Sequence, residues 1–106
     1  MPVYLISQLK IFDRKRFRQM QMSFMAIKPE GAIILAGDSA PKLTVGEDCP
    51  DHVGILAFCD HAAAEAFLGS PEYQTVAVMR EACAEVQTLL IDGAAIDLEL
   101  LAQQKC

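Results

Sequence analysis

Apolar and polar positions alternate along the first residues of the chain. In an extended segment, successive side chains point to opposite faces, so Val3 and Leu5 share one face while Tyr4 and Gln8 share the other. This period of two predicts a β-strand over residues 2–12, with its more apolar face turned toward a core.

The apolar period then lengthens, because apolar side chains recur at every third or fourth position between Phe17 and Ile27. That spacing places them along one side of a helix. Asp13 is a suitable N-cap for this helix, and a proline and a glycine shortly after residue 28 would end it. We therefore predict a helix over residues 14–28.

The remainder of the chain shows the same succession of extended and helical patterns. Short apolar runs bounded by glycine, proline or acidic residues predict strands, and capped, alanine-rich segments predict helices. Ser70, Pro71 and Glu72 supply the cap, the first-turn proline and the first-turn acid of a helix start. The expected strands are 31–37, 43–45, 52–59 and 86–91; the expected helices lie between Asp60 and Gly69, after Ser70, and within 94–106.

A strand, helix and strand that occur twice in succession are typical of the ferredoxin-like fold. In this α+β fold, a split β-α-β sandwich, an antiparallel sheet carries its helices on one face. A chain of 106 residues has room for one such domain. We predict that residues 1–93 form it and that residues 94–106 are a C-terminal extension forming a short helix.

The predicted strands are apolar on both faces. Residues 33–35 and 89–91 are consecutive apolar residues, and residues 53–58 contain no polar side chain. A sheet with water on one side would alternate between apolar and polar residues. Because the helices can cover only one face, we predict that a second copy covers the other, giving a homodimer that pairs through its sheets as a dimeric α/β barrel.

Composition and charge narrow the functional classes. The chain is 53% hydrophobic and 22% charged, which excludes a disordered chain. No apolar run approaches the ~18 residues that a membrane-spanning helix needs. A net charge of -5 argues against binding to nucleic acid or to a membrane surface. The N-terminal sequence also lacks the basic region of a secretory signal, so we expect a cytoplasmic protein.

The cysteines and histidines do not form a recognisable metal or redox motif. The four cysteines have no C-x-x-C spacing, and neither histidine stands near them at the spacing of zinc ligands. We expect no metal and no cofactor, and we expect Cys59 and Cys83 to be reduced and buried as small apolar residues.

The second half of the chain carries a motif that resembles a known family. An apolar strand and an alanine-rich helix lead to Phe67-Leu68-Gly69-Ser70-Pro71-Glu72-Tyr73-Gln74, followed by Arg80 and a strand that ends at Gly93. With the opening strand before Asp13, this resembles domain of unknown function family 1330 over about residues 3–93. The resemblance implies a small bacterial protein of the dimeric α/β-barrel, ferredoxin-like superfamily. Wider relatives there include cofactor-independent monooxygenases, isomerising or dehalogenating enzymes and haem-degrading enzymes.

Tyr73 and Arg80 are the strongest candidate binding residues. They are seven positions apart, so two helical turns place them on one face of the helix that follows Ser70. A guanidinium fork beside a phenol can hold a carboxylate or an enolate. The alternative is structural: Tyr73 would pack in the core, and Arg80 would pair with a carboxylate such as Asp13.

Four further polar residues complete the candidate ligand site, and the first of them is Asp13 after the opening strand. Tyr4 and Gln8 are polar positions on the first strand. His52 begins a strand and would act as a general base if its ring faced an apolar cavity; the alternative is an exposed loop histidine.

A basic run at the start of the first helix is a candidate anion patch, formed by Arg14, Lys15, Arg16 and Arg18. Residues 1–18 contain five basic residues and one acidic residue, whereas the rest of the chain is strongly acidic. Basic residues in the first turn oppose the helix dipole. The run therefore marks either an anion or partner site, or a solvated helix face.

Two functions fit these features. In the first, a pocket between the sheet and the helices binds or transforms a small apolar or anionic organic molecule without a cofactor. In the second, the homodimer has no chemistry, and its basic helix or C-terminal tail docks a partner. A cavity large enough for a substrate would favour the first function, and a fully closed core would favour the second.

Overall fold

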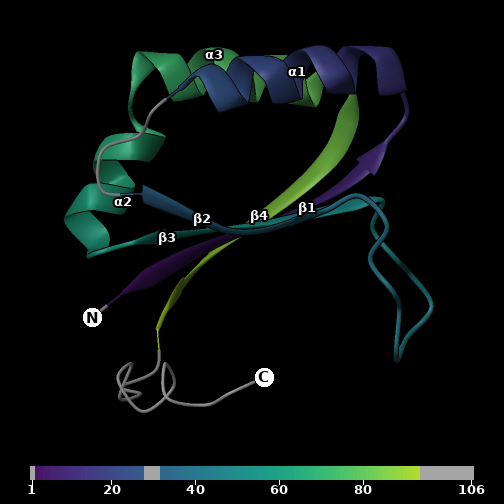
Figure 1. Cartoon of the computed structure of the whole chain (residues 1–106), viewed down its shortest axis with the longest axis horizontal. Helices are drawn as coiled ribbons and strands as arrows, with labels where there is room; N and C mark the ends of the chain where they lie inside the picture. The colour runs from purple at the N-terminus through teal and green to yellow at the C-terminus, as the bar shows by residue number, and fades with distance from the viewer. Residues whose placement is uncertain (1, 28–31, 94–106) are drawn as a thin grey trace.

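A computed structural model describes residues 2–27 and 32–93 (Figure 1). Within them the chain forms four strands and three helices in the predicted alternation. The elements are, in order, β1 (Val3–Ile11), α1 (Arg14–Ala26), β2 (Ala32–Asp38), β3 (His52–Phe58), α2 (His61–Leu68), α3 (Pro71–Glu81) and β4 (Ala84–Asp92).

The four strands form one antiparallel sheet in the order β2-β3-β1-β4. β1 lies at the centre, where Leu5 pairs with Leu56 of β3 and with Leu90 of β4. α1 and α3 lie over one face of this sheet, and α2 lies at one end (Figure 1). The predicted ferredoxin-like α+β fold is therefore confirmed.

The capping residues predicted from the sequence start the helices. The side chains of Asp13, Asp60 and Ser70 accept hydrogen bonds from backbone N–H groups three residues later, which satisfies donors that no helical carbonyl can reach. Ser70 also donates to the carbonyl of Phe67 at the end of α2, so one hydroxyl joins two helices. This local chemistry sets the break between α2 and α3.

The core lies between the sheet and the helices. β1 contributes the odd-numbered residues that the alternating pattern assigned to the inner face, and they pack against aromatic side chains of the helices. Phe58, Phe67 and Tyr73 stack with ring centres 5.4 and 4.8 Å apart. The buried residues of the two core clusters are Val3, Leu5, Leu9, Phe17, Met20, Leu56, Phe58, Ala64, Phe67, Tyr73, Val76, Cys83 and Ala84.

Two predictions on local structure are wrong. Residues 43–45 belong to the long loop between β2 and β3 and pair with no described strand. Asp51 fixes the end of this loop to β1, because its carboxylate accepts from the N–H of Ile11 and its own N–H donates to the carbonyl oxygen of Leu9, each at 2.8 Å.

The second wrong prediction concerns Cys59, which is exposed because it follows the last residue of β3. Cys83 is buried as expected.

Other predictions fall partly or wholly outside the described residues. α1 is described to Ala26, and the predicted stop near residues 28–31 lies outside the described chain. The same is true of the predicted helix within 94–106. Among the described helices, none combines the length and the apolar character that crossing a membrane requires.

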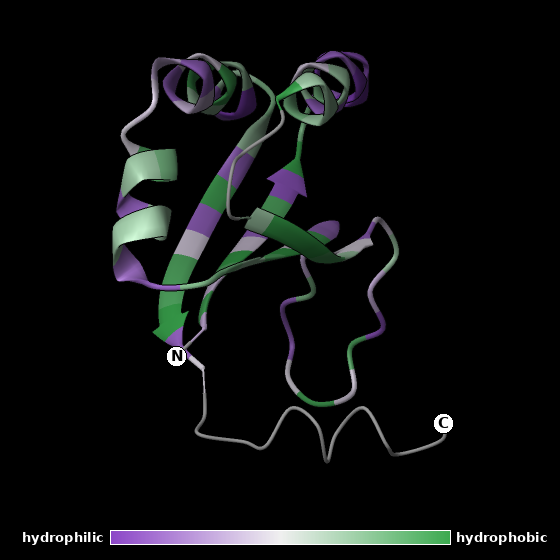
Figure 2. Cartoon of the chain, turned by 60° about the vertical axis from the view of Figure 1, so that its left-hand side comes forward, coloured by the Kyte–Doolittle hydropathy of each residue, from purple (hydrophilic) through white to green (hydrophobic). Residues whose placement is uncertain are grey.

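The second face of the sheet is apolar and carries no helix (Figures 1 and 2). Ile6 occupies its centre, since it pairs with Ile55 on one side and with Leu89 on the other. Ile33 of β2 and Ile91 of β4 are 65% and 41% exposed, although both are large aliphatic side chains. An apolar surface of this kind is the feature that led us to predict a homodimer.

Gly93 closes the sheet against the start of β1 and leaves no room for a side chain. Its N–H donates to the carbonyl oxygen of Pro2 at 2.7 Å, and a Cβ on Gly93 would lie 2.7 Å from that oxygen and 3.0 Å from a ring carbon of Tyr4. We expect Gly93→Ala to lower the free energy of unfolding by about 1–3 kcal/mol, because backbone atoms must move.

Urea unfolding of Gly93→Ala beside Gly37→Ala measures this effect. Gly37 also lies in the sheet, but a Cβ there meets no atom within 4 Å, so its substitution should leave stability nearly unchanged. Equal stabilities of the two variants would show that the contact between Gly93 and Pro2 does not restrict the backbone.

Candidate functional site

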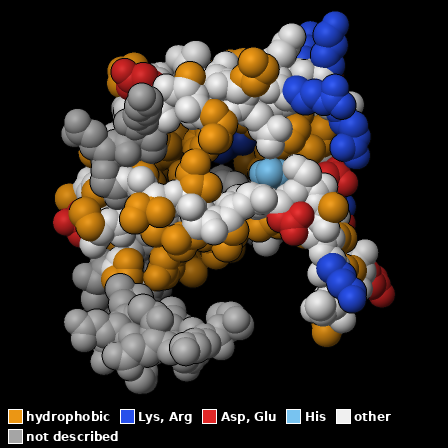
Figure 3. Space-filling model, in the orientation of Figure 1, with side chains coloured by type: hydrophobic (Ala, Val, Ile, Leu, Met, Phe, Trp, Pro, Cys, Tyr) orange, Lys and Arg blue, Asp and Glu red, His pale blue; other side chains and the backbone are white. Residues whose placement is uncertain are grey.

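A cavity of about 930 Å³ lies between α1 and the half of the sheet that holds β2 and β3. It opens as a hollow in the centre of the surface shown in Figure 3, with apolar side chains around it and a histidine at its rim. A volume in this range is typical of sites that enclose a small organic molecule.

The floor of the cavity is deep because three neighbouring strands carry small residues at the same level. Ser7 of β1 pairs with Gly54 of β3, and Gly54 pairs with Gly37 of β2. All three residues line the cavity. Larger side chains at these three positions would fill the space between the sheet and α1. The small residues leave that space empty.

The opposite wall is α1, which packs mainly against α3 and makes few contacts with the sheet. Its inner residues Phe17 and Met20 are buried, whereas Met22 and Met25 are 75% and 66% exposed and line the cavity. The thioether side chains are flexible, so this wall can adapt to apolar ligands of different shapes.

Arg80 and Tyr73 come together on the α3 side of the cavity, as their spacing predicted. The Nη2 of Arg80 donates to the hydroxyl oxygen of Tyr73 at 3.1 Å, and the guanidinium carbon lies 5.5 Å from the centre of the Tyr73 ring. The ring is buried and backed by Phe67 at 4.8 Å. The aromatic stack therefore fixes the position of the guanidinium.

One donor of this guanidinium has no partner. The Nε of Arg80 is buried, and no described residue accepts a hydrogen bond from it. A buried donor of a charged group left unpaired costs about 1–3 kcal/mol or more, so proteins generally pair such groups. Arg80 also lines the cavity, where an anionic oxygen would pair with the other N–H groups of its guanidinium.

His52 lies on the sheet side, at the start of β3, and its partly buried ring lines the cavity. Its Nδ1 is 2.9 Å from the Oγ of Ser39, and the ring packs edge to face against Phe17 with centres 5.3 Å apart. Burial lowers the pKa of His52 from its ordinary value of 6.5, while the nearby Asp38 opposes the shift. The lowered pKa favours the uncharged imidazole.

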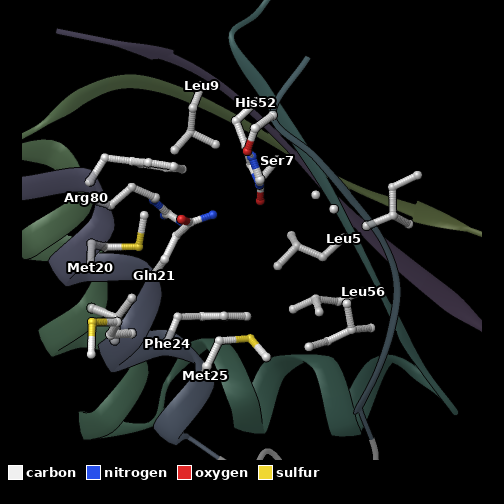
Figure 4. Close-up of a pocket in the computed structure, with 18 of the residues that line it drawn as sticks. Leu5, Ser7, Leu9, Met20, Gln21, Phe24, Met25, His52, Leu56 and Arg80 are labelled. Carbon is white, nitrogen blue, oxygen red and sulfur yellow. Dashed lines mark hydrogen bonds between the residues drawn. The ribbon is translucent and has the colours of Figure 1, made fainter. Parts of the chain in front are cut away.

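The cavity has a polar part and an apolar part. In Figure 4 the labelled side chains of Ser7, His52, Gln21 and Arg80 gather in the upper half of the cavity. The lower half is bounded by labelled apolar side chains, namely Leu56, Phe24 and Met25. A ligand that fits this distribution carries a polar or charged group at one end of an apolar body.

The structure does not bring every candidate residue to the cavity. Asp13 caps α1 and lies 3.4 Å from the Nε of Arg16, so the predicted alternative pairing of Asp13 with Arg80 is wrong. Tyr4 and Gln8 are even-numbered residues of β1 and face the helix-free side of the sheet, since β1 alternates. Their predicted role beside Arg80 is therefore not supported by the geometry.

The basic run is exposed on α1 and only one of its members reaches the cavity. Arg18 lines the cavity. Arg14, Lys15 and Arg16 point to solvent and do not line it. In Figure 3 basic side chains gather at one end of the molecule, near the hollow. The run thus contributes positive potential near the cavity entrance, where it would attract anions.

The lining residues that the sequence did not indicate as site residues include Ser7, Gly54, Gln21 and Ser39. A signal for the first two is present in the sequence. Ser7 interrupts the apolar inner face of β1, and Gly54 interrupts an apolar strand. Their meeting in one row depends on the pairing register, which the sequence does not display.

The described residues contain no cluster of three or more histidine, cysteine, aspartate or glutamate side chains suited to hold a metal ion. The polar groups that line the cavity are two guanidinium groups, one imidazole, one amide and three hydroxyl groups. They belong to Arg18 and Arg80, to His52, to Gln21, and to Ser7, Ser39 and Tyr73. These groups can bind an anion and exchange protons with it.

Comparisons with known proteins place the chain in a structural context. A family model described as Domain of unknown function (DUF1330) matches residues 2–94. No curated protein matches the chain.

Several solved structures share the fold at low sequence identity. A dimeric ferredoxin-like protein of unknown function from Jannaschia sp. CCS1 is 14% identical, with a TM-score of 0.69 over 88% of this chain and 100% of that one. An ethyl tert-butyl ether D family protein from Bacillus halodurans C-125 is 14% identical, with a TM-score of 0.68 over 89% and 100%. SnoaB, a cofactor-independent oxygenase from Streptomyces nogalater, is 13% identical, with a TM-score of 0.59 over 90% and 95%.

Proposed function

Because the chain belongs to the family Domain of unknown function (DUF1330), whose name assigns no activity, we propose a function from the cavity itself. The protein binds a small organic anion that has an apolar body, and it does so without a cofactor. The anionic group is held by Arg80 and Tyr73, and the apolar body lies against the methionines and phenylalanines of α1.

The guanidinium of Arg80, held by Tyr73 at the wall of a largely apolar cavity, is the observation that carries this proposal. The hydrogen bond to the Tyr73 hydroxyl uses one of the five N–H donors of the guanidinium, and the Tyr73 ring fixes its position, so the other donors are preorganised for a ligand oxygen. Arginine binds carboxylates through two parallel N–H donors, and the apolar surroundings strengthen such a bond. A cavity large enough for a substrate also favours this function over the alternative, in which the dimer has no chemistry and only docks a partner.

We also propose that the protein is a homodimer, in which two copies pair through the apolar, helix-free face of the sheet. This face and the cavity lie on opposite sides of the sheet, so pairing leaves the cavity open. Two structural neighbours, from Jannaschia and from Thermobifida fusca, are described as dimeric ferredoxin-like proteins. A self-complementary apolar face is what a two-fold dimer uses.

A structural neighbour makes a cofactor-free site reasonable on this fold. SnoaB is described as a cofactor-independent oxygenase, so a protein of similar fold acts without a cofactor. A shared fold does not transfer the reaction, so the ligand class proposed here rests on this chain's own residues.

Titration calorimetry with 3-phenylpropanoate, an apolar carboxylate, tests the proposed binding. We expect wild-type protein to bind it and Gly54→Val to lose binding, because valine fills the cavity floor. A Cβ on Gly54 meets only the His52 Nε2 at 3.9 Å and the Ala36 carbonyl oxygen at 4.0 Å, so the added side chain enters open space. Native mass spectrometry of the same samples reports the assembly and any retained ligand.

Thr88→Val is the matched control for this experiment. Thr88 lies on β4, where it pairs with Ser7 of the neighbouring strand β1. It therefore belongs to the same row of the sheet as Gly54, but it does not line the cavity. It should bind 3-phenylpropanoate like the wild type. If the wild type does not bind, or if Gly54→Val binds equally well, the proposal is wrong and a docking role for the dimer gains support.

A further inference from the structure

We propose that this cavity catalyses enolisation of an apolar 2-oxo acid, with His52 as the base that removes a proton from the carbon beside the carbonyl group. Arg80 and Tyr73 hold the carboxylate and the oxyanion that forms. The inference rests on the proposed function, because the same cavity holds the substrate. It adds a reaction and assigns His52 a catalytic role.

His52 is arranged as a proton acceptor. Ser39 Oγ lies 2.9 Å from Nδ1, so the tautomer in which Nδ1–H donates to Ser39 leaves a lone pair on Nε2. Nε2 lies 3.9 Å from the position that a Cβ of Gly54 would occupy, which places it over the small residues of the cavity floor. The edge-to-face contact with Phe17 fixes the ring plane.

The donors for the oxyanion approach from the opposite wall. His52 belongs to the sheet and Arg80 to α3, and both line the polar half of the cavity in Figure 4. The Tyr73 oxygen accepts from Arg80, so the Tyr73 O–H proton is available to a ligand, and Arg80, which lines the cavity, has N–H donors beyond the one that Tyr73 uses. A base on one wall and two donors on the other are what proton removal beside a carbonyl requires.

The step balances without an oxidant or a reductant. The proton leaves the substrate carbon for Nε2 of His52, and the electron pair of that C–H bond forms the carbon–carbon double bond of the enolate. The carbonyl π pair moves onto its oxygen, where Tyr73 and Arg80 stabilise the negative charge. Return of the proton to carbon regenerates the 2-oxo acid, and protonation of oxygen gives the enol.

The cavity also indicates the substrate class. A 2-oxo acid carries a carboxylate and a carbonyl oxygen on adjacent carbons, which suits a guanidinium with a phenol beside it. Its acidic C–H lies on the next carbon, between the anionic group and the apolar remainder. The apolar half of the cavity, bounded by Phe24 and Met25, would hold that remainder.

Phenylpyruvate in deuterated water tests the proposal. We expect proton NMR to show exchange of its C3 protons for deuterium faster with wild-type protein than in buffer alone. His52→Gln should slow the catalysed exchange by about 100-fold, the contribution typical of a general base. The same variant should still bind 3-phenylpropanoate, because the carboxylate is held by Arg80.

His61→Gln is the matched control, since it removes the other histidine. His61 is exposed, lies 2.5 Å from Asp92 and does not line the cavity, so exchange should equal that of the wild type. Asp38 is the charged group close enough to affect the His52 ring, and Arg18 and Arg80 line the same cavity. The wild-type exchange rate should fall at acidic pH as the imidazole becomes protonated, and the residual rate of His52→Gln should not follow this profile.

The outcomes separate this inference from the proposed function. Wild-type protein that binds 3-phenylpropanoate but does not accelerate exchange overturns enolisation and leaves binding intact. Equal catalysed exchange by His52→Gln and the wild type overturns the role of His52. Failure of the wild type to bind 3-phenylpropanoate overturns the proposed function and, with it, this inference.

Discussion

Replacing Ile6 with aspartate is expected to convert the proposed homodimer into a folded monomer. Ile6 lies at the centre of the helix-free face, between Ile55 and Leu89, so its side chain would be buried when two sheets meet. A buried, unpaired carboxylate opposes association strongly, and two-fold symmetry places one in each half of the interface. We expect the dissociation constant to rise by about a thousandfold or more.

The variant should keep its fold because Ile6 belongs to neither buried core cluster. Sedimentation velocity at micromolar concentration measures the assembly, and circular dichroism checks the fold. Val78→Asp is the matched control: it places the same charge at a 68% exposed aliphatic residue of α3, away from the helix-free sheet face, and should remain dimeric. Wild-type protein that sediments as a monomer, or Ile6→Asp protein that remains a dimer, would contradict pairing through this face.

The second large effect concerns Arg80. Replacing it with methionine should weaken the binding of 3-phenylpropanoate by about 10- to 100-fold, because a hydrogen bond to a charged group contributes about 1.5–3 kcal/mol. The neutral 3-phenylpropanamide, which has the same apolar body, should bind the two proteins with similar affinity. Titration calorimetry with both compounds therefore separates the loss of charge recognition from a general change in the cavity.

Stability distinguishes a binding role of Arg80 from a structural one. Methionine loses the hydrogen bond to Tyr73, but it also removes the buried Nε donor that lacks a described partner. These two contributions oppose each other, and methionine occupies similar apolar space, so we expect little change in the free energy of unfolding. A strongly destabilised variant with intact binding would assign Arg80 to the structure alone.

Arg14→Met controls for the change in net charge. Arg14 is exposed on α1 and does not line the cavity, so its substitution removes one positive charge without altering any lining residue. Binding of 3-phenylpropanoate should decrease only slightly, and this decrease should vanish at high salt because exposed charges are screened. An equal loss in Arg14→Met and Arg80→Met would mean that overall charge, and not the fixed guanidinium, governs binding.

The sequence by itself determined the succession of elements. Periods of two and of three to four residues are local properties, and capping by Asp13, Asp60 and Ser70 acts within one helical turn, so no tertiary contact is needed to read them. The apolar character of both strand faces is equally visible along the chain. The prediction of a short strand at residues 43–45 is wrong. A pattern of three residues becomes a strand only when a neighbouring strand pairs with it, and that pairing is not a local property.

The tertiary structure decided the candidate site. Tyr73 and Arg80 are predictable as a pair because both belong to one helix, but the sequence does not show that Arg80 keeps an unpaired buried Nε. The cavity exists because the register aligns Ser7, Gly54 and Gly37 across three strands, beneath a helix that packs mainly against α3. Strand register and the distance of a helix from a sheet depend on contacts between residues far apart in the chain, and local patterns carry no record of them.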